Sequence, residues 1–169
     1  MNNSRILLIE YCNYTDYPIG GYLSFAKQMV SAYGNKLSLV GVSEDDTPVG
    51  VWTKKNINGV EFDFFSLRKI NKTNKKKLIP RRIINFLLLR KYIDNILSVN
   101  IPNIFIQTPE ALFAMRYDKH FNVCTRIPGV ENPLSISRYW YGKYLARLFD
   151  LFFFKYLRKT SLILATADH

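Results

Sequence analysis

A turn that follows the first apolar run holds the residues best suited to contact a ligand. The run 5–11 is typical of a buried strand, and the turn before the next helical segment contains Asp16, Tyr17, Gly20 and Gly21. Backbone N–H groups at a helix start favour anions, and glycine lets a phosphate or sugar approach without a Cβ in the way. The turn lacks the GxGxxG and P-loop patterns. Two interpretations of the turn are open. It is one wall of a ligand site, which its position at the carboxyl end of a strand favours, or the glycines only form a tight turn.

Two further loops carry polar residues at the ends of predicted strands. Glu110 starts a short helix after the strand 103–107, and Arg126 and Glu131 lie at and beyond the end of the strand 122–127. The carboxyl ends of parallel strands meet at one edge of a sheet, so these loops should converge on the glycine turn. Glu110 is either a general base toward a hydroxyl or a helix cap favoured by the dipole. Arg126 and Glu131 either bind a ligand, which would be a sugar or a phosphate, or form an ion pair with each other.

Residues for metal or serine-nucleophile chemistry are sparse. The chain has two histidines and two cysteines, and neither type clusters with acidic residues at metal-ligand spacing. No GxSxG elbow is present. We therefore predict no metal site and no bound cofactor, and we expect Cys12 and Cys124 to be reduced thiols.

The order of predicted elements indicates an α/β fold. Apolar strand patterns alternate with helical patterns, and Asn58–Gly59 predicts a hairpin turn. The expected strands are 5–11, 36–43, 49–53, 60–65, 103–107, 122–127 and 162–166. The expected helices are 22–33, 80–97, 110–116 and 137–159. Most strands are continuous apolar runs, which predicts a mostly parallel sheet covered on both faces: a three-layer, Rossmann-like single domain over 1–169.

The chain ends three residues after a strand that we expect to be central in the sheet. A closing helix normally follows such a strand. We therefore expect these 169 residues to be the first half of something longer.

The positive charge is concentrated in one segment. The net charge is +11, and ten basic residues without an acidic one lie between Arg68 and Lys91. We expect a patch for an anionic membrane surface or a partner protein, made of Lys75, Lys76, Lys77, Arg81, Arg82 and Phe154. The alternative is that the aromatic residues pack in the hydrophobic core and the lysines are ordinary solvent-exposed surface residues. No nucleic-acid module is recognisable, so nucleic acid is not an expected partner.

No signal peptide or membrane span is evident, which predicts a cytoplasmic protein, peripheral on the inner membrane face if the basic patch binds lipid.

Several segments together resemble the glycosyltransferase family 4-like amino-terminal domain. The opening strand with its Pro-Ile-Gly-Gly turn and helix is similar to the start of that domain. The segments 103–109 and 156–168 are similar to its fourth strand and to its closing helix and strand. Thr125-Arg-Ile-Pro-Gly129 lies where many members have a strand ending in His-Gly or His-Asp. Pro128 replaces the common histidine, which puts a histidine contact to the sugar in doubt.

This resemblance implies the amino-terminal half of a GT-B fold, in which two Rossmann-like domains face each other across a cleft. It implies a nucleotide-sugar as co-substrate, a glycan or lipid-linked acceptor, and no metal. The amino-terminal half would shape the acceptor site, with Gly20 and Gly21 at the cleft. The nucleotide-sugar domain would be absent from this chain, so the chain alone should be inactive. The alternative is a different kind of function: the chain would be a non-catalytic α/β binding module that docks on an anionic membrane surface or on a partner protein.

Overall fold

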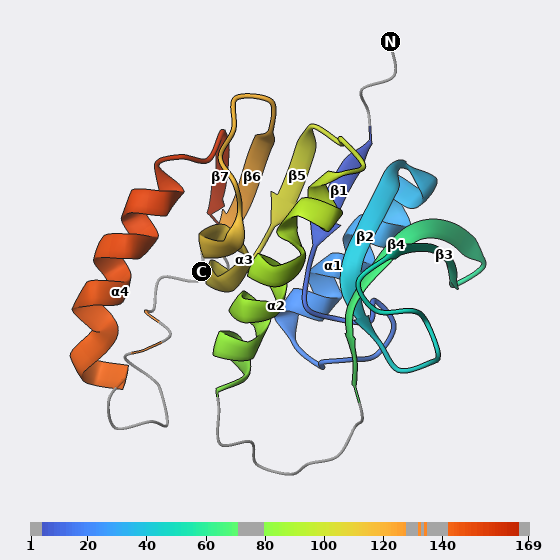
Figure 1. Ribbon diagram of the computed structural model, residues 1–169, viewed down its shortest axis with the longest axis horizontal. Helices are drawn as coiled ribbons and strands as arrows, with labels where there is room; N and C mark the ends of the chain where they lie inside the picture. Colours follow the sequence, from blue (N-terminus) through green and yellow to red (C-terminus); the bar gives the residue numbers. More distant parts are fainter. Residues whose placement is uncertain (1–4, 71–79, 128–131, 133, 135–141, 166–169) are drawn as a thin grey trace.

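The chain forms an α/β domain with one mixed sheet between two layers of helices (Figure 1). This computed structural model describes residues 5–70, 80–127, 132, 134 and 142–165. The strands are β1 (Ile6–Ile9), β2 (Leu37–Ser43), β3 (Trp52–Ile57), β4 (Val60–Lys69), β5 (Asn103–Ile106), β6 (Asn122–Ile127) and β7 (Leu162–Ala165). The helices are α1 (Gly21–Tyr33), the 3-10 turn η1 (Gly34–Lys36), α2 (Arg81–Leu97), α3 (Pro109–Ala114) and α4 (Gly142–Leu157).

The sheet order is β3-β4-β2-β1-β5-β6-β7, and among the described strands only the β3–β4 pair is antiparallel. The strands β1, β2 and β5 are nearly all buried, because helices cover both of their faces. The carboxyl ends of the parallel strands lie along one edge, the lower edge in Figure 1. The α/β class and the mostly parallel sheet predicted from the sequence are confirmed.

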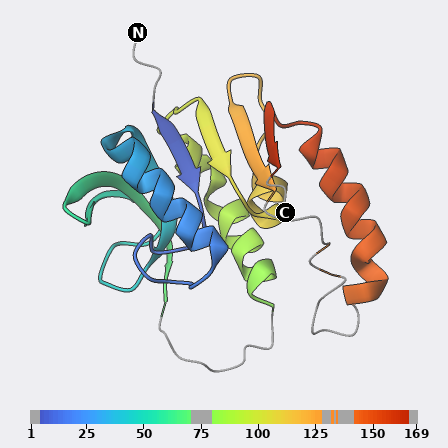
Figure 2. The ribbon, with the colours of Figure 1, turned by 180° about the vertical axis from the view of Figure 1, so that it is seen from behind.

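Each face of the sheet has its own apolar core. On one face, α1 packs through Leu23, Ala26 and Val30, which share one side of the helix. On the other face, α2 packs mainly through Leu89 and Ile93. Figure 2 shows α1 on the side of the sheet opposite α2. The three layers follow directly from these two cores.

The hairpin differs from the predicted one at both strands. Asn58 and Gly59 have φ of 52° and 84°, the conformation of a two-residue turn, so pairing begins directly beside them at Ile57 and Val60. The first strand is therefore Trp52–Ile57 and not 49–53. The second runs on to Lys69 because its far half pairs with β2, where Ser43 lies opposite Lys69.

Two other predicted strands change at their ends. The first strand stops at Ile9 and not at residue 11, because a hydrogen-bonded loop begins there. The last strand was expected to be central. Among the described residues it pairs only with β6 at the edge of the sheet, and all four of its residues are exposed.

Gly41 on β2 provides a test of the packing against the β1 loop. A Cβ at Gly41 would lie 2.3 Å from the Cys12 carbonyl oxygen and 2.8 Å from the Tyr14 ring. The variant Gly41→Ala should lower the free energy of unfolding by about 2 kcal/mol or more, because backbone must shift to admit the methyl group. Urea denaturation measures this. In the control Gly21→Ala the Cβ meets nothing within 4 Å, so equal losses in both variants would contradict the packing described here.

Candidate functional site

Asn13 organises the loop between β1 and α1. Its side-chain oxygen accepts hydrogen bonds from the backbone N–H groups of Thr15, Asp16 and Tyr17, each at 2.9 Å. Its amide nitrogen donates to Asp16 Oδ1 at 2.7 Å and to Glu44 Oε1 at 2.8 Å. One buried amide therefore gives the loop a defined shape at the carboxyl end of β1.

The start of α1 exposes backbone to solvent at this edge. Gly20 has φ of 146°, a conformation that favours glycine, and no side chain caps the helix. A Cβ placed at Gly20 or Gly21 would meet nothing within 4 Å. The two glycines are therefore not required by packing against the protein, which agrees with a surface that another molecule can approach closely.

A chain of hydrogen bonds links the ends of β1, β5 and β6. Gln107, just after β5, donates through Nε2 to Glu10 Oε2 at 3.0 Å and accepts from Arg126 Nη1 at 2.9 Å. The second Glu10 oxygen accepts from the Tyr11 backbone N–H at 2.9 Å. Phe25 of α1 lies under the Arg126 guanidinium at 4.3 Å from its ring centroid. The guanidinium is thus fixed at the edge of the sheet by the chain on one side and an aromatic face on the other.

Glu10 is an acidic group in an unusual state. Burial raises the pKa of the Glu10 carboxyl to about 7, against the opposing effect of the Tyr11 N–H hydrogen bond. Its side chain is almost fully buried, and the charge of Glu110 adds to the increase. A carboxyl that titrates near neutral pH at the end of a parallel strand is typical of functional sites.

Glu110 belongs to the same group. It lies in the first turn of α3, with its carboxylate 3.5 Å from Arg82 Nε on α2. Burial raises the pKa of Glu110, and the nearby Arg82 charge opposes this effect. The side-chain cap of α3 is Thr108, whose Oγ1 accepts from the Ala111 N–H at 3.4 Å. The cap role considered for Glu110 from the sequence is therefore filled by Thr108.

Tyr22 lies among these charged groups. The pKa of its phenol is raised, first by burial, and the charges of Arg82, Glu10, Glu110 and Arg126 also act on it. This residue directly follows the two glycines. Tyr22 thus links the glycine turn to the region in which these four charges act.

The structure separates the predicted residues into groups. It places Asp16 and Tyr17 in the Asn13 loop, and it places Glu110 and Arg126 where the charges of both act on the Tyr22 phenol. Glu131 and the three lysines Lys75, Lys76 and Lys77 lie outside the described residues.

The described residues of the expected basic patch lie in two different places, at the carboxyl edge of the sheet and on α4. Arg82 pairs with Glu110, and Arg81 lies 5.7 Å from the Tyr17 ring centroid, so both belong to the carboxyl edge. Phe154 lies on α4, where its ring contacts Phe153.

Sequence reasoning missed three residues of this site: Glu10, Gln107 and Asn13. The signal for Glu10 and Gln107 was their position directly after apolar strands, where a polar side chain reaches the carboxyl edge. Glu10 was instead counted within the strand 5–11. Asn13 had no comparable signal, because its role depends on the shape of the loop.

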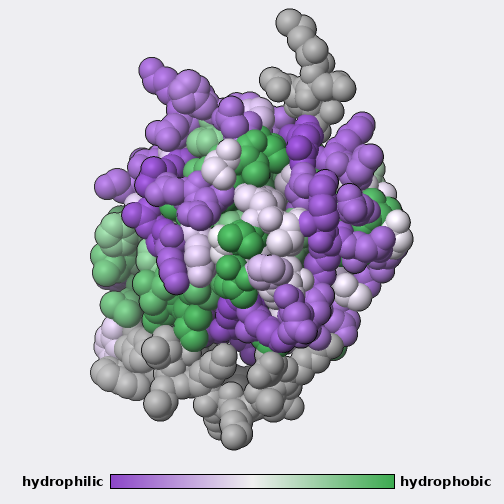
Figure 3. Space-filling model, turned by 45° about the vertical axis from the view of Figure 1, so that its right-hand side comes forward, coloured by the Kyte–Doolittle hydropathy of each residue, from purple (hydrophilic) through white to green (hydrophobic). Residues whose placement is uncertain are grey.

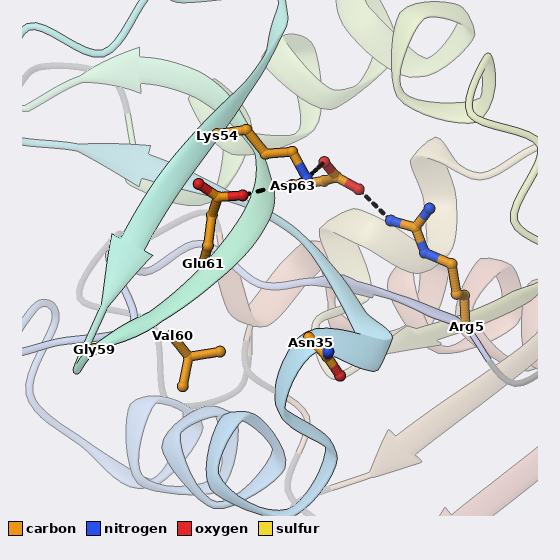
Figure 4. Close-up of a pocket in the computed structure, with 7 residues that line it drawn as sticks. All are labelled: Arg5, Asn35, Lys54, Gly59, Val60, Glu61 and Asp63. Atoms are coloured by element: carbon orange, nitrogen blue, oxygen red, sulfur yellow. Dashed lines mark hydrogen bonds and ion pairs between the residues drawn. The ribbon is translucent and has the colours of Figure 1, made fainter.

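A second concave area lies at the opposite edge of the sheet (Figure 4). This open cavity of about 600 Å³ is lined by Arg5, Asn35, Lys54, Gly59, Val60, Glu61 and Asp63. Its charged groups satisfy one another: Asp63 pairs with Arg5 and, at 2.8 Å, with Lys54. Ligands of parallel sheets bind beyond the carboxyl ends of strands, so we favour the Glu10 edge as the site. Within the described residues no cluster of three metal-ligating side chains occurs.

Comparisons with known proteins support the fold. No protein-family model and no curated protein sequence matches this chain. Among solved structures it is similar to sucrose-phosphate synthase from Thermosynechococcus elongatus, with 12% sequence identity and a TM-score of 0.55. The match covers 96% of this chain and 47% of the other, so this chain spans about half the length of that structure. At this identity the likeness shows the fold alone, a Rossmann-like domain like one half of a GT-B protein.

The raised pKa of Glu10 predicts how stability depends on pH. An unfolded glutamate loses its proton near pH 4.5, whereas folded Glu10 keeps it until about pH 7. Between these values the folded state binds more protons, so the free energy of unfolding should fall as pH rises, by up to about 3 kcal/mol.

Urea denaturation from pH 4.5 to 8 measures this slope. The variant Glu10→Gln should remove that part of the slope. The control Glu61→Gln, at an exposed carboxyl, should keep it. A wild-type slope unchanged in Glu10→Gln would contradict the assignment.

Proposed function

We propose that this chain is the acceptor-side domain of a glycosyltransferase that moves a sugar from a nucleotide-sugar to a glycan or lipid-linked acceptor. The observation that carries the proposal is the convergence of Glu10, Gln107 and Arg126 with Glu110 and Arg82 at the carboxyl edge, next to exposed Gly20–Gly21. The GT-B-like fold supports it. The nucleotide-sugar domain would lie outside this chain, and the chain alone would be inactive.

The proposed roles follow from the charges and contacts at the edge. Arg126 and Arg82 offer guanidinium groups to the phosphates or hydroxyls of a ligand, and Arg126 retains a buried Nε with no hydrogen-bond partner. Glu110 remains beside a cation and accepts a hydrogen bond from the acceptor hydroxyl. Glu10 and Gln107 act through Arg126 by holding its orientation.

In the proposed reaction the acceptor oxygen bonds to the anomeric carbon while the bond from that carbon to the donor phosphate breaks. The nucleotide leaves with the electron pair, and a carboxylate at the edge takes the hydroxyl proton. Orientation of the acceptor supplies much of the rate. By the family resemblance, no metal takes part.

Replacement of Gly21 by tryptophan tests the proposal. Gly21 is exposed and a Cβ there meets nothing within 4 Å, so the bulky side chain leaves the backbone into open space beside the turn. We expect kcat/KM for sugar transfer to fall at least tenfold, with an unchanged unfolding midpoint. The assay uses the protein in its full natural length, with radiolabelled UDP-, GDP- and ADP-sugars and extracted lipids and glycans as acceptors.

The control is Gln28→Trp. Gln28 is exposed on the same side of α1, two turns away from Gly21. It should leave transfer unchanged. Equal activity of Gly21→Trp and wild type would remove the turn from the site, and no transfer from any donor by the wild-type protein would refute the proposed activity.

A further inference from the structure

The outer face of α4 carries large apolar side chains in contact with solvent. Tyr144 is 80% exposed and Leu151 is 71% exposed. The same helix exposes a further set of apolar residues, each between 44% and 55%: Leu145, Leu148, Phe152 and Phe154. A helix packed only against its own domain presents polar residues to water, so this face is unusual for a surface helix.

The inner face of α4 already anchors the helix to the domain. Phe149 lies 5.6 Å from Phe113 of α3, and Tyr156 lies 5.5 Å from the same ring. Leu157 is buried in the core on this face of the sheet. The apolar residues that α4 exposes to solvent lie outside the ring contacts that Phe149 and Tyr156 make with α3.

An apolar groove continues this surface toward α2. It has a volume of about 380 Å³, and its lining includes Phe86 of α2 together with Leu145, Leu148 and Phe152 of α4. The view in Figure 3 shows hydrophobic surface gathered at one side of the molecule. In Figures 1 and 2, α4 is the outermost helix at the β7 end of the sheet.

The charges on α4 indicate the kind of partner. The exposed charged residues at 144–159 are all cationic: Arg147, Lys155, Arg158 and Lys159. Asp150, the single acid in that segment, is half-buried and accepts from Asn132 Nδ2 at 2.7 Å. A face that combines exposed leucine and aromatic residues with cations alone complements an anionic lipid surface. A second copy of the same face would bring cations against cations, which opposes self-association.

We propose that α4 binds an anionic membrane surface, with Leu151 and Tyr144 entering the headgroup region and Arg147 and Arg158 contacting lipid phosphates. The helix lies in the interface and does not span it, since no described helix is long and apolar enough to cross a membrane. This centres the lipid-binding surface on α4, whereas the patch expected from the sequence combined Phe154 of this helix with the basic residues Lys75, Lys76, Lys77, Arg81 and Arg82. The proposal does not depend on the transferase activity.

Sedimentation with lipid vesicles tests this surface. The protein should bind vesicles of phosphatidylcholine with 30% phosphatidylglycerol, and binding should weaken in high salt and on pure phosphatidylcholine. Leu151→Asp should reduce affinity at least tenfold, because it places a charge in the headgroup region. The double variant Arg147→Gln/Arg158→Gln should lose roughly fivefold for each cation removed. Circular dichroism should show native folds, as these side chains are exposed.

Matched controls make the same two kinds of substitution elsewhere on the surface. Val51→Asp changes an exposed apolar residue near β3, and Lys27→Gln/Lys36→Gln removes two cations on the α1 side. Both should bind like wild type. Unchanged binding of Leu151→Asp would overturn the proposal, as would loss confined to a Lys75, Lys76 and Lys77 triple glutamine variant. A dimer of the wild-type protein that Leu151→Asp dissociates, without vesicle binding, would assign the face to a second copy instead.

Discussion

The hydrogen-bond chain from Glu10 through Gln107 to Arg126 is the constraint on which the carboxyl edge depends. It joins the ends of three neighbouring strands, β1, β5 and β6, and each member is held in part by the next. Burying a carboxyl costs free energy unless the group is hydrogen-bonded or neutral. Glu10 accepts two hydrogen bonds, and its pKa is raised to about 7, which favours the neutral form. The same chain fixes the Arg126 guanidinium over the ring of Phe25 on α1.

The sequence was sufficient for the fold class and for the location of the edge. Continuous apolar strands predicted a parallel sheet, and topology alone then brought Glu110 and Arg126 to the region of Gly21. It was not sufficient for the contacts. Arg82 was assigned to a separate basic patch because a run of charges looks uniform in sequence, whereas the α2 helix directs Arg82 toward Glu110. Glu10 was missed because the end of a short strand is set by the loop that follows, and Asn13 fixes that loop.

The two proposed surfaces have different physical origins. At the carboxyl edge, polar groups are buried and paired, and the energetic cost of their burial is offset by hydrogen bonds within the domain. On α4, large apolar side chains are exposed to solvent. An edge that binds a polar ligand and a helix that binds lipid would together suit an acceptor delivered from a membrane, but each surface is tested without the other.

The most direct measurement for the carboxyl edge is sugar transfer by the full-length protein with Arg126→Gln, alongside its thermal unfolding. Our account predicts a fall in kcat/KM of about a hundredfold or more in a folded protein, because Arg126 is the member of the chain placed to meet the ligand. The control Arg116→Gln, which breaks an exposed ion pair with Asp94, should retain transfer. Transfer by Arg126→Gln at the wild-type rate would contradict the assignment of this edge as the site.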